Sequence, residues 1–250
     1  RPADVFDCMD AYAAATTRGR ELYGQVTPFP EIMDFNLREP YPLESLASWQ
    51  PAMAASGDEN LMAVFRDLGF REQVKAELKI AGAPFRFSNQ WNTMTIQSKA
   101  PSERGALDKR SIAEMAQAQD KHPLDCMLDL ALSERLETNF TVGMFNAEED
   151  AVTRLLTHER ACIGLGDAGA HLTFFCQAGT GLYLLQRFVR ERGDLTLQDA
   201  IYRLTRQPAE AMRIGGRGSI TVGAHADLFL FDADTVGIGA RCMVDDLPGG

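Results

Sequence analysis

The sequence lacks the features that mark membrane, secreted and nucleic-acid-binding proteins. No apolar run approaches the roughly 20 residues that cross a bilayer, and the first residues lack the basic and apolar regions of a signal peptide. Basic residues are outnumbered, 25 against 35 acidic ones, which gives a formal charge of −10. This balance argues against binding to nucleic-acid phosphates or to an anionic membrane. We therefore expect a cytoplasmic protein without nucleic-acid or membrane partners.

Short metal, redox and nucleophile motifs are missing as well. The five cysteines are scattered and include no C-x-x-C, so we expect neither a zinc knuckle nor disulfides, and most should be small core residues. No G-x-S-x-G elbow occurs. The four histidines form neither H-x-H nor H-E-x-x-H; they are His122, His158, His171 and His225. By itself the sequence provides no complete zinc site.

The remaining composition is that of a globular protein, with 45% hydrophobic and 24% charged residues over 250 positions. The first half predicts a helix over 3–23 that stops at Gly24, followed by a short strand at Gln25-Val26. From 27 to 110, prolines alternate with aromatic residues. This pattern is typical of a long ordered insertion, in which we predict one helix near 58–78.

Helix-start signals dominate the second half of the sequence. Ser111 and Glu114 form a capping box, and Pro123 suits the first turn of the next helix. Asn146, together with Glu149, is expected to cap a further helix that reaches about residue 156.

The last third mixes both kinds of element. The apolar run 161–165 predicts a buried strand, and Thr196 and Pro208 are expected to begin two helices late in the chain. The segments 219–222 and 227–232 have the alternation of strands. This mixture predicts an α/β fold with a small β appendage.

The strongest local motif follows the predicted strand at 161–165. Gly164, Gly166 and Gly169 spell G-x-G-x-x-G before a helix, the fingerprint of a dinucleotide-binding oxidoreductase. However, the carboxylate of Asp167 would repel a pyrophosphate, and no second parallel strand is predicted. Two other interpretations stay open on the pattern alone. Asp167 either ends a barrel strand, where barrel enzymes place catalytic groups, or caps the following helix.

Several motifs in a fixed order favour the barrel interpretation. The stretches 164–171, 195–200 and 204–209 resemble the end of the amidohydrolase superfamily barrel, and 217–232 is similar to its return to a small β-sandwich domain. The final residues, 245–250, resemble the close of the N-acyl-D-amino-acid deacylase (D-aminoacylase) branch. We therefore identify a resemblance to the C-terminal portion of that branch.

The resemblance implies an architecture. Residues 1–215 would be the C-terminal part of a metal-dependent hydrolase barrel of the TIM type, (β/α)8, with 27–110 as an irregular insertion. Residues 216–250 would be strands that return to the β-sandwich domain. Gln25-Val26 would be the seventh barrel strand, and the insertion before the eighth strand would extend to residue 146.

The resemblance also implies an activity on a small-molecule substrate, hydrolysis of the C–N amide bond of N-acyl-D-amino acids or related amides. Asp167 would be the general base, taking a proton from water held by zinc and passing one to the departing amine. Asp167 would also be a metal ligand where the N-terminal histidines of the family are present, and His171 would contribute to substrate binding.

The family's H-x-H has no counterpart in this sequence. We therefore expect catalysis only together with N-terminal strands that this sequence does not contain. The alternative is a truncated or degenerate module without catalysis. Exposed strand edges of a partial barrel would favour a homo-oligomer.

Four arginines of the insertion are candidates for binding a substrate carboxylate, although solvated surface arginines are more common and none is assigned. They are Arg38, Arg71, Arg86 and Arg104.

Overall fold

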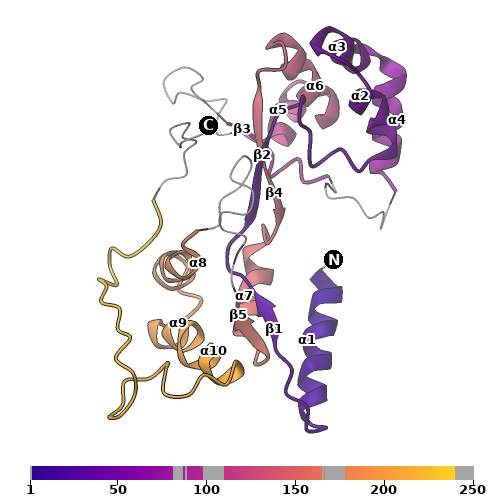
Figure 1. The fold of residues 1–250 in the computed structure, drawn as a ribbon. Coiled ribbons are helices and arrows are strands. Elements are labelled where there is room, and N and C mark those ends of the chain that lie inside the picture. Colours follow the sequence, from indigo (N-terminus) through magenta and orange to yellow (C-terminus); the bar gives the residue numbers. More distant parts are fainter. Residues whose placement is uncertain are drawn as a thin grey trace. The chain divides into compact units, whose positions relative to one another are not determined.

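The structure is a computed structural model that describes residues 2–80, 87, 89–97, 110–164, 166 and 178–239. The chain divides into two compact units. The first, which we call the split unit, consists of Arg1–Pro30 and nearly all of the chain from Asn146 onward. The second, the inserted unit, consists chiefly of Glu31–Phe145. Figure 1 follows the chain through both units.

The described elements of the split unit are α1 (Pro2–Thr16), β1 (Gly24–Val26), α7 (Glu149–Thr157), β5 (Ala161–Ile163), α8 (Thr180–Tyr183), the π-helix η3 (Leu184–Glu191), α9 (Leu197–Leu204) and α10 (Arg206–Ala211). The two strands, far apart in sequence, pair in parallel as expected for a mixed α/β arrangement.

Helix α1 is shorter than the sequence predicts. It ends at Thr16, whose hydroxyl donates a hydrogen bond back to the Tyr12 carbonyl, and Gly19 adopts a left-handed conformation with φ of 75°. Gly24 therefore does not stop this helix but begins β1. A Cβ on Gly24 would lie 2.5 Å from the Met9 sulfur, so a larger residue would fit where α1 packs against the strand only if the Met9 side chain moved.

The helix starts of the split unit are only partly as predicted. Thr196 caps α9 as expected, since its hydroxyl accepts from the Asp199 backbone N–H at 3.1 Å. Pro208, in contrast, is the third residue of α10, because that helix begins at Arg206. Asn146 does not cap α7, which begins at Glu149 without a side-chain cap.

The described elements of the inserted unit are β2 (Glu31–Phe35), the 3-10 helix η1 (Ala47–Trp49), α2 (Gln50–Met53), α3 (Asp58–Arg66), α4 (Leu68–Leu78), β3 (Thr95–Gln97), α5 (Ile112–Ala118), α6 (Pro123–Ser133) and β4 (Asn139–Phe145). Its three strands form an antiparallel sheet in the order β2-β4-β3. The sequence did not reveal this sheet, because its strands are short and separated by more than forty residues.

The core of the inserted unit is aromatic, which explains the aromatic residues that separate the prolines. Trp49, Phe65 and Phe70 form a triangle with ring centroids 5.3–6.0 Å apart. Phe35 of β2 and Phe140 of β4 lie 5.5 Å apart between their ring centroids. All five side chains are buried, so the predicted irregular insertion is a packed unit with its own core.

Local capping rules explain the helix boundaries of this unit. The predicted helix near 58–78 is divided at Asp67, which has an extended backbone and whose carboxylate accepts from the Phe70 N–H at 2.7 Å. The capping box of Ser111 and Glu114 is present at the start of α5, and Pro123 is the first residue of α6. Both of these predictions are confirmed.

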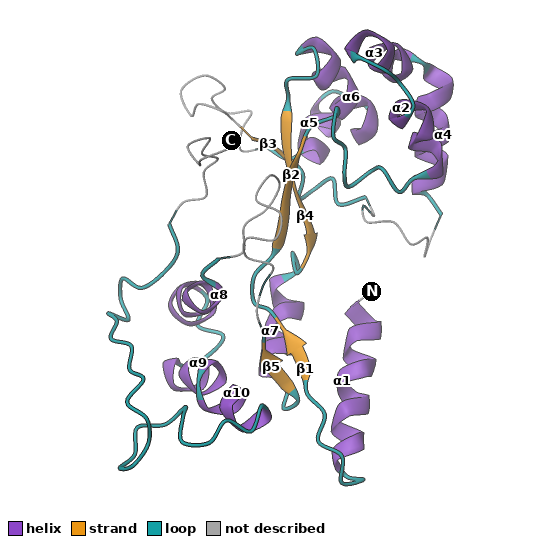
Figure 2. Ribbon diagram, viewed as in Figure 1, coloured by secondary structure: helices purple, strands orange, loops and turns teal. Residues whose placement is uncertain are grey.

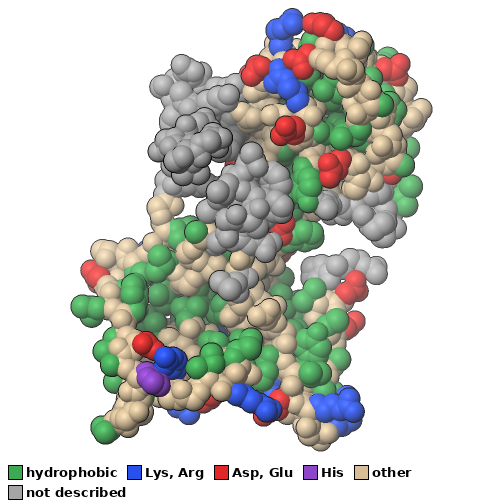
Figure 3. Space-filling model, in the orientation of Figure 1, with side chains coloured by type: hydrophobic (Ala, Val, Ile, Leu, Met, Phe, Trp, Pro, Cys, Tyr) green, Lys and Arg blue, Asp and Glu red, His purple; other side chains and the backbone are tan. Residues whose placement is uncertain are grey.

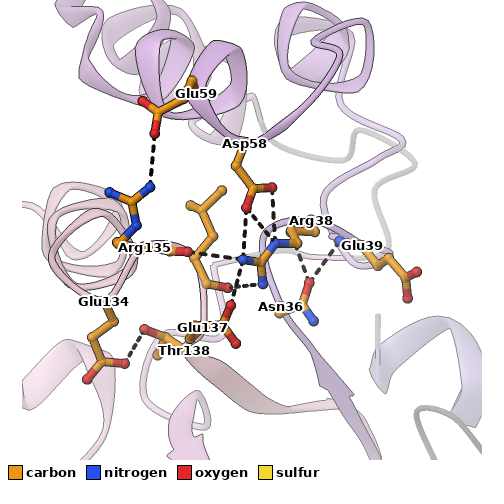
Figure 4. A network of polar contacts seen from close by, with 10 residues as sticks. Asn36, Arg38, Glu39, Asp58, Glu59, Glu134, Arg135, Glu137 and Thr138 are labelled. Atoms are coloured by element: carbon orange, nitrogen blue, oxygen red, sulfur yellow. Dashed lines mark hydrogen bonds and ion pairs between the residues drawn. The ribbon is translucent and has the colours of Figure 1, made fainter.

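Arg38 joins three segments of the inserted unit (Figure 4). Its guanidinium contacts Asp58 at the start of α3 at 3.0 Å and Glu137 at 2.7 Å. It also donates to the carbonyls of Arg135 and Leu136, both at 3.1 Å, and these residues have left-handed φ angles of 52° and 66°. Arg38 thereby stabilises a strained turn between α6 and β4.

The tail after α10 does not form the strands that its alternation predicts. In the described part of the tail, 212–239, every residue is irregular or in a turn. Ile220, Val222 and Leu230 are 91% or more exposed. Strands need partners for their backbone groups, and no described strand lies beside these segments. Figure 3 shows hydrophobic side chains on the surface of the part that carries α8–α10.

None of the helices that the structure describes is long and apolar enough to span a bilayer.

We expect Arg38→Ala to lower the free energy of unfolding of the inserted unit by about 1 kcal/mol, because two carbonyls of the strained turn lose their donor. The matched control is Arg135→Ala, whose ion pair with Glu59 is about three-quarters exposed on both sides and should cost under ~0.5 kcal/mol. Urea unfolding followed by tryptophan fluorescence measures both, since Trp49 and Trp91 belong to this unit. Equal losses would contradict the role assigned to Arg38.

We also expect the 250-residue chain to self-associate, because the exposed apolar tail offers a surface that water solvates poorly. Sedimentation velocity should detect dimers or larger species at micromolar concentrations. The double variant Val222→Thr/Leu230→Thr should shift the distribution toward the monomer. A wild-type chain that sediments as a monomer would show this expectation to be wrong.

Candidate functional site

The parallel pair of β1 and β5 defines the edge at which the predicted site belongs. Gln25 is in register with Cys162 and Val26 with Ile163. The Gly164 N–H donates to the Val26 carbonyl at 2.8 Å, which continues the ladder one residue beyond β5. Since parallel strands end at the same edge, the segments that follow Val26 and Ile163 both leave the sheet there.

The two faces of this pair differ. Val26 and Ile163 pack against a core cluster formed by α7, η3 and α9, whose buried residues include Leu156, Leu184 and Phe188. Alternation along a strand places the neighbours of these residues on the opposite face. That second face carries Gln25, Cys162 and Gly164. The helices thus cover one side of the pair, and the polar residue of β1 lies on the other.

The predicted catalytic residue Asp167 and the predicted substrate residue His171 lie outside the described residues. The structure describes Gly164 and Gly166 of the same segment, directly after β5. The roles of Asp167 and His171 therefore stay predictions.

Asn146 joins the two chain segments that flank the inserted unit. Its side-chain amide donates to the carbonyls of Thr27 and Phe29 at 3.3 and 3.2 Å, and its own φ is 54°. Asn146 thus holds the segment after β1 against the segment before α7. This function replaces the helix cap predicted for it, and the pattern of the sequence gave no signal of this contact across more than a hundred residues.

An ion-pair network fixes α7 to the π-helix η3. Arg187 binds both carboxylate oxygens of Glu149 at 2.7 and 2.8 Å, and Arg192 contacts the same carboxylate at 2.9 Å. The hydrogen bonds from Arg187, with the charges of both arginines, hold the pKa of Glu149 below its ordinary value of 4.5. Glu149 therefore remains ionised when the network is formed.

Asp194 extends this network beyond the end of η3. Its carboxylate accepts from the Thr153 hydroxyl and from Arg192 Nε, each at 2.6 Å. Both hydrogen bonds lower the pKa of Asp194, and the one from Thr153 has the larger effect. The helices α7 and η3 are therefore joined by buried apolar contacts as well as by charged ones.

Three of the four histidines lie within the described residues. At the start of β5, His158 Nδ1 accepts from the Arg160 N–H at 3.1 Å, and its Nε2 lies 3.5 Å from Asp10 Oδ1. His122 caps α6 through Nδ1, and burial lowers its pKa. His225 is exposed in the tail.

Of the four candidate arginines in the insertion, the two that the structure describes are engaged with carboxylates of the chain itself. Arg38 binds Asp58 and Glu137. Arg71 is buried and contacts Asp125 and Asp129 at 3.2 and 2.8 Å. Neither is available for a substrate carboxylate. Two further candidates, Arg86 and Arg104, lie outside the described residues.

The described part of the chain does not supply a metal site. It contains no group of three or more His, Cys, Asp or Glu side chains that could hold a metal ion. Cys126 and Cys162 are buried, and burial raises the pKa of both thiols, as expected of core cysteines rather than of metal ligands. Cys8, in contrast, is exposed. The residues described here therefore do not fit a zinc site on their own.

Comparisons with known proteins place this chain among larger relatives. A model described as "Amidohydrolase family" matches residues 79–246. An N-acyl-D-glutamate deacylase of Alcaligenes xylosoxydans xylosoxydans is 38% identical over 96 residues, which are 37% of this chain and 19% of that protein. An uncharacterized protein of Mycobacterium tuberculosis is 30% identical over 132 residues, 51% of this chain and 21% of that one. The chain spans about a fifth of the length of these curated relatives.

Solved structures of the same kind cover most of the chain at low identity. An N-acyl-D-glutamate deacylase from Bordetella bronchiseptica, complexed with zinc and a phosphonate inhibitor, has 20% identity and a TM-score of 0.45, and the match covers 93% of this chain and 38% of that one. A D-aminoacylase has 17% identity and a TM-score of 0.44, with 94% and 38% covered.

The Glu149 network generates a pH-dependent prediction. A carboxyl group with a lowered pKa in the folded state stabilises that state above its ordinary pKa, 4.5 for Glu149, and this contribution is lost as the pH falls through the lowered value. We expect the hydrogen-exchange protection of the η3 amides, corrected for intrinsic rates, to decrease as the pH falls below 4.5.

At neutral pH, Glu149→Gln should reduce this protection, and its pH dependence should become shallower. The matched control is Asp150→Asn, because Asp150 also contacts Arg192 but is 94% exposed. Protection that is equal in the wild-type chain and the Glu149→Gln variant would show that the ion pairs do not hold η3.

Proposed function

This chain belongs to the amidohydrolase family, and from that premise we propose that it forms the C-terminal part of a hydrolase of carbon–nitrogen amide bonds. The family match over 79–246 carries this proposal, since it includes the whole segment from β5 to α10. The 38% identity with an N-acyl-D-glutamate deacylase supports a D-aminoacylase-like activity on N-acyl-D-amino acids or related amides. The substrate would be a small molecule.

We propose that β1 and β5 are the seventh and eighth strands of a TIM-type barrel. Their parallel pairing and the helices on one face support this architecture. Their outer edges are unpaired within the described residues. A groove of about 520 Å³ between α1 and β1, lined by Met9, Tyr12 and Gln25 among others, leaves space beside β1 for a neighbouring strand. Residues 216–250 would then belong to the small β-sandwich domain.

Asp167 is the proposed general base. It follows β5 by four residues, after the glycines 164 and 166, which leave room around the end of the strand. A carboxylate there would accept a proton from the attacking water and return one to the departing amine. His171, four residues further on, is proposed to contact the substrate. Both residues would act at the edge where the two strands end.

A metal, zinc in our proposal, would polarise the amide carbonyl and acidify water when bound. The described residues of this chain do not provide ligands for this metal. Asp167, which lies outside them, would contribute one ligand. The remaining ligands would come from N-terminal strands of a longer protein. We propose that this protein is cytoplasmic.

The alternative of a dinucleotide-binding oxidoreductase is not favoured. After η3 the described chain continues into α9 and α10, and no parallel strand follows to complete a βαβ unit. The family match points to hydrolysis instead.

The proposal is tested in the longer protein by replacing Asp167 with Asn, which keeps the shape but cannot accept a proton. We expect turnover of an N-acyl-D-amino acid to fall by at least ~100-fold, with an unchanged circular dichroism spectrum. The matched control is Glu159→Gln at the opposite end of β5, where the side chain is 69% exposed and turnover should be unchanged. Full turnover in the Asp167→Asn variant would refute the proposed role.

A further inference from the structure

The residue of β1 that faces away from the helices is polar. Gln25 is the middle residue of the strand, and it is exposed while its neighbours Gly24 and Val26 are partly buried. Strands of a parallel sheet are ordinarily apolar on both faces, because other elements cover both. Gln25 is therefore a polar residue on the face of the pair that the described helices leave uncovered.

Gly164 allows the Gln25 side chain to extend toward the carboxyl edge. A Cβ built on Gly164 would lie 3.2 Å from the Cβ, 3.3 Å from the Cδ and 3.4 Å from the Cγ of Gln25. The Gln25 side chain thus lies across Gly164, the first residue after β5, at the edge where that strand ends. Asp167 follows Gly164 by only three residues in the sequence.

The chemistry of a carboxamide indicates what Gln25 recognises. The C=O and N–H of a trans secondary amide point to opposite sides, so one carboxamide can contact only one of them. The NH2 group of Gln25 can donate to the C=O, a contact that an ionised carboxylate cannot make. The substrate of the proposed hydrolase contains such an amide.

We infer that Gln25 is a substrate-binding residue that hydrogen-bonds the amide group of the N-acyl amino acid. This inference rests on the proposed function, because it takes the carboxyl edge of β1 and β5 as the substrate side. Gln25 orients the amide without taking part in proton transfer. Its loss should therefore change binding much more than turnover.

The test is steady-state kinetics of the longer protein with an N-acyl-D-amino acid. We expect Gln25→Ala to raise KM about tenfold, the equivalent of one hydrogen bond, with kcat changed less than about threefold. Gln25→Glu keeps the length of the side chain but lacks the donor, so it should raise KM to a similar extent. The matched control is Gln198→Ala, the same replacement at an exposed position of α9, with unchanged KM.

Gly164→Ala provides a second variant, because the added methyl group would lie 3.2–3.4 Å from three Gln25 carbons and the glutamine side chain would have to shift by a few tenths of an ångström. Its effect on KM should not add to that of Gln25→Ala in the double variant, since both remove the same contact. A Gln25→Ala enzyme with unchanged KM, or with reduced kcat alone, overturns the inference while leaving the proposed function standing. A longer protein that is inactive on every N-acyl-D-amino acid overturns both.

Discussion

The structure of the split unit depends on the parallel pairing of two strands of three residues each, β1 and β5, which lie on either side of the inserted unit in the sequence. Such a short ladder is not stable by itself. It persists because Val26 and Ile163 share one apolar cluster with α7, η3 and α9. The Glu149 ion pairs then fix two of those helices to each other. Every proposal about the site requires this pair, since it decides which chain segments meet at the carboxyl edge.

The inserted unit imposes a second constraint. More than a hundred residues separate the two chain segments that contain β1 and β5, and these segments must still be held side by side. Asn146 meets this constraint by binding the carbonyls of Thr27 and Phe29. The insertion has its own sheet and aromatic core, and therefore does not draw on the apolar residues of the split unit. A long excursion between two neighbouring strands is thus compatible with a short ladder.

The sequence predicted those features that arise from contacts between near neighbours. The capping box at Ser111, the helix start at Thr196, the proline start of α6 and the two strands β1 and β5 depend on a few adjacent residues, and all are present. The sheet β2-β4-β3, the Asn146 contacts and the orientation of Gln25 depend on residues far apart, which local patterns do not encode. The tail misled the prediction for a related reason, since alternating residues such as Ile220 and Val222 form a strand only beside a partner. For Asp167, the sequence and its family remain the basis of the prediction.

The most direct test of our central claim is a crystal structure of the longer protein grown with zinc, in which anomalous scattering locates the metal. We expect parallel strands on the outer edges of both β1 and β5, with the ion beside the Asp167 carboxylate on the Gln25 face of the pair. A metal bound elsewhere, or an Asp167 side chain on the helix-covered face, would contradict the hydrolytic site that we place at this edge.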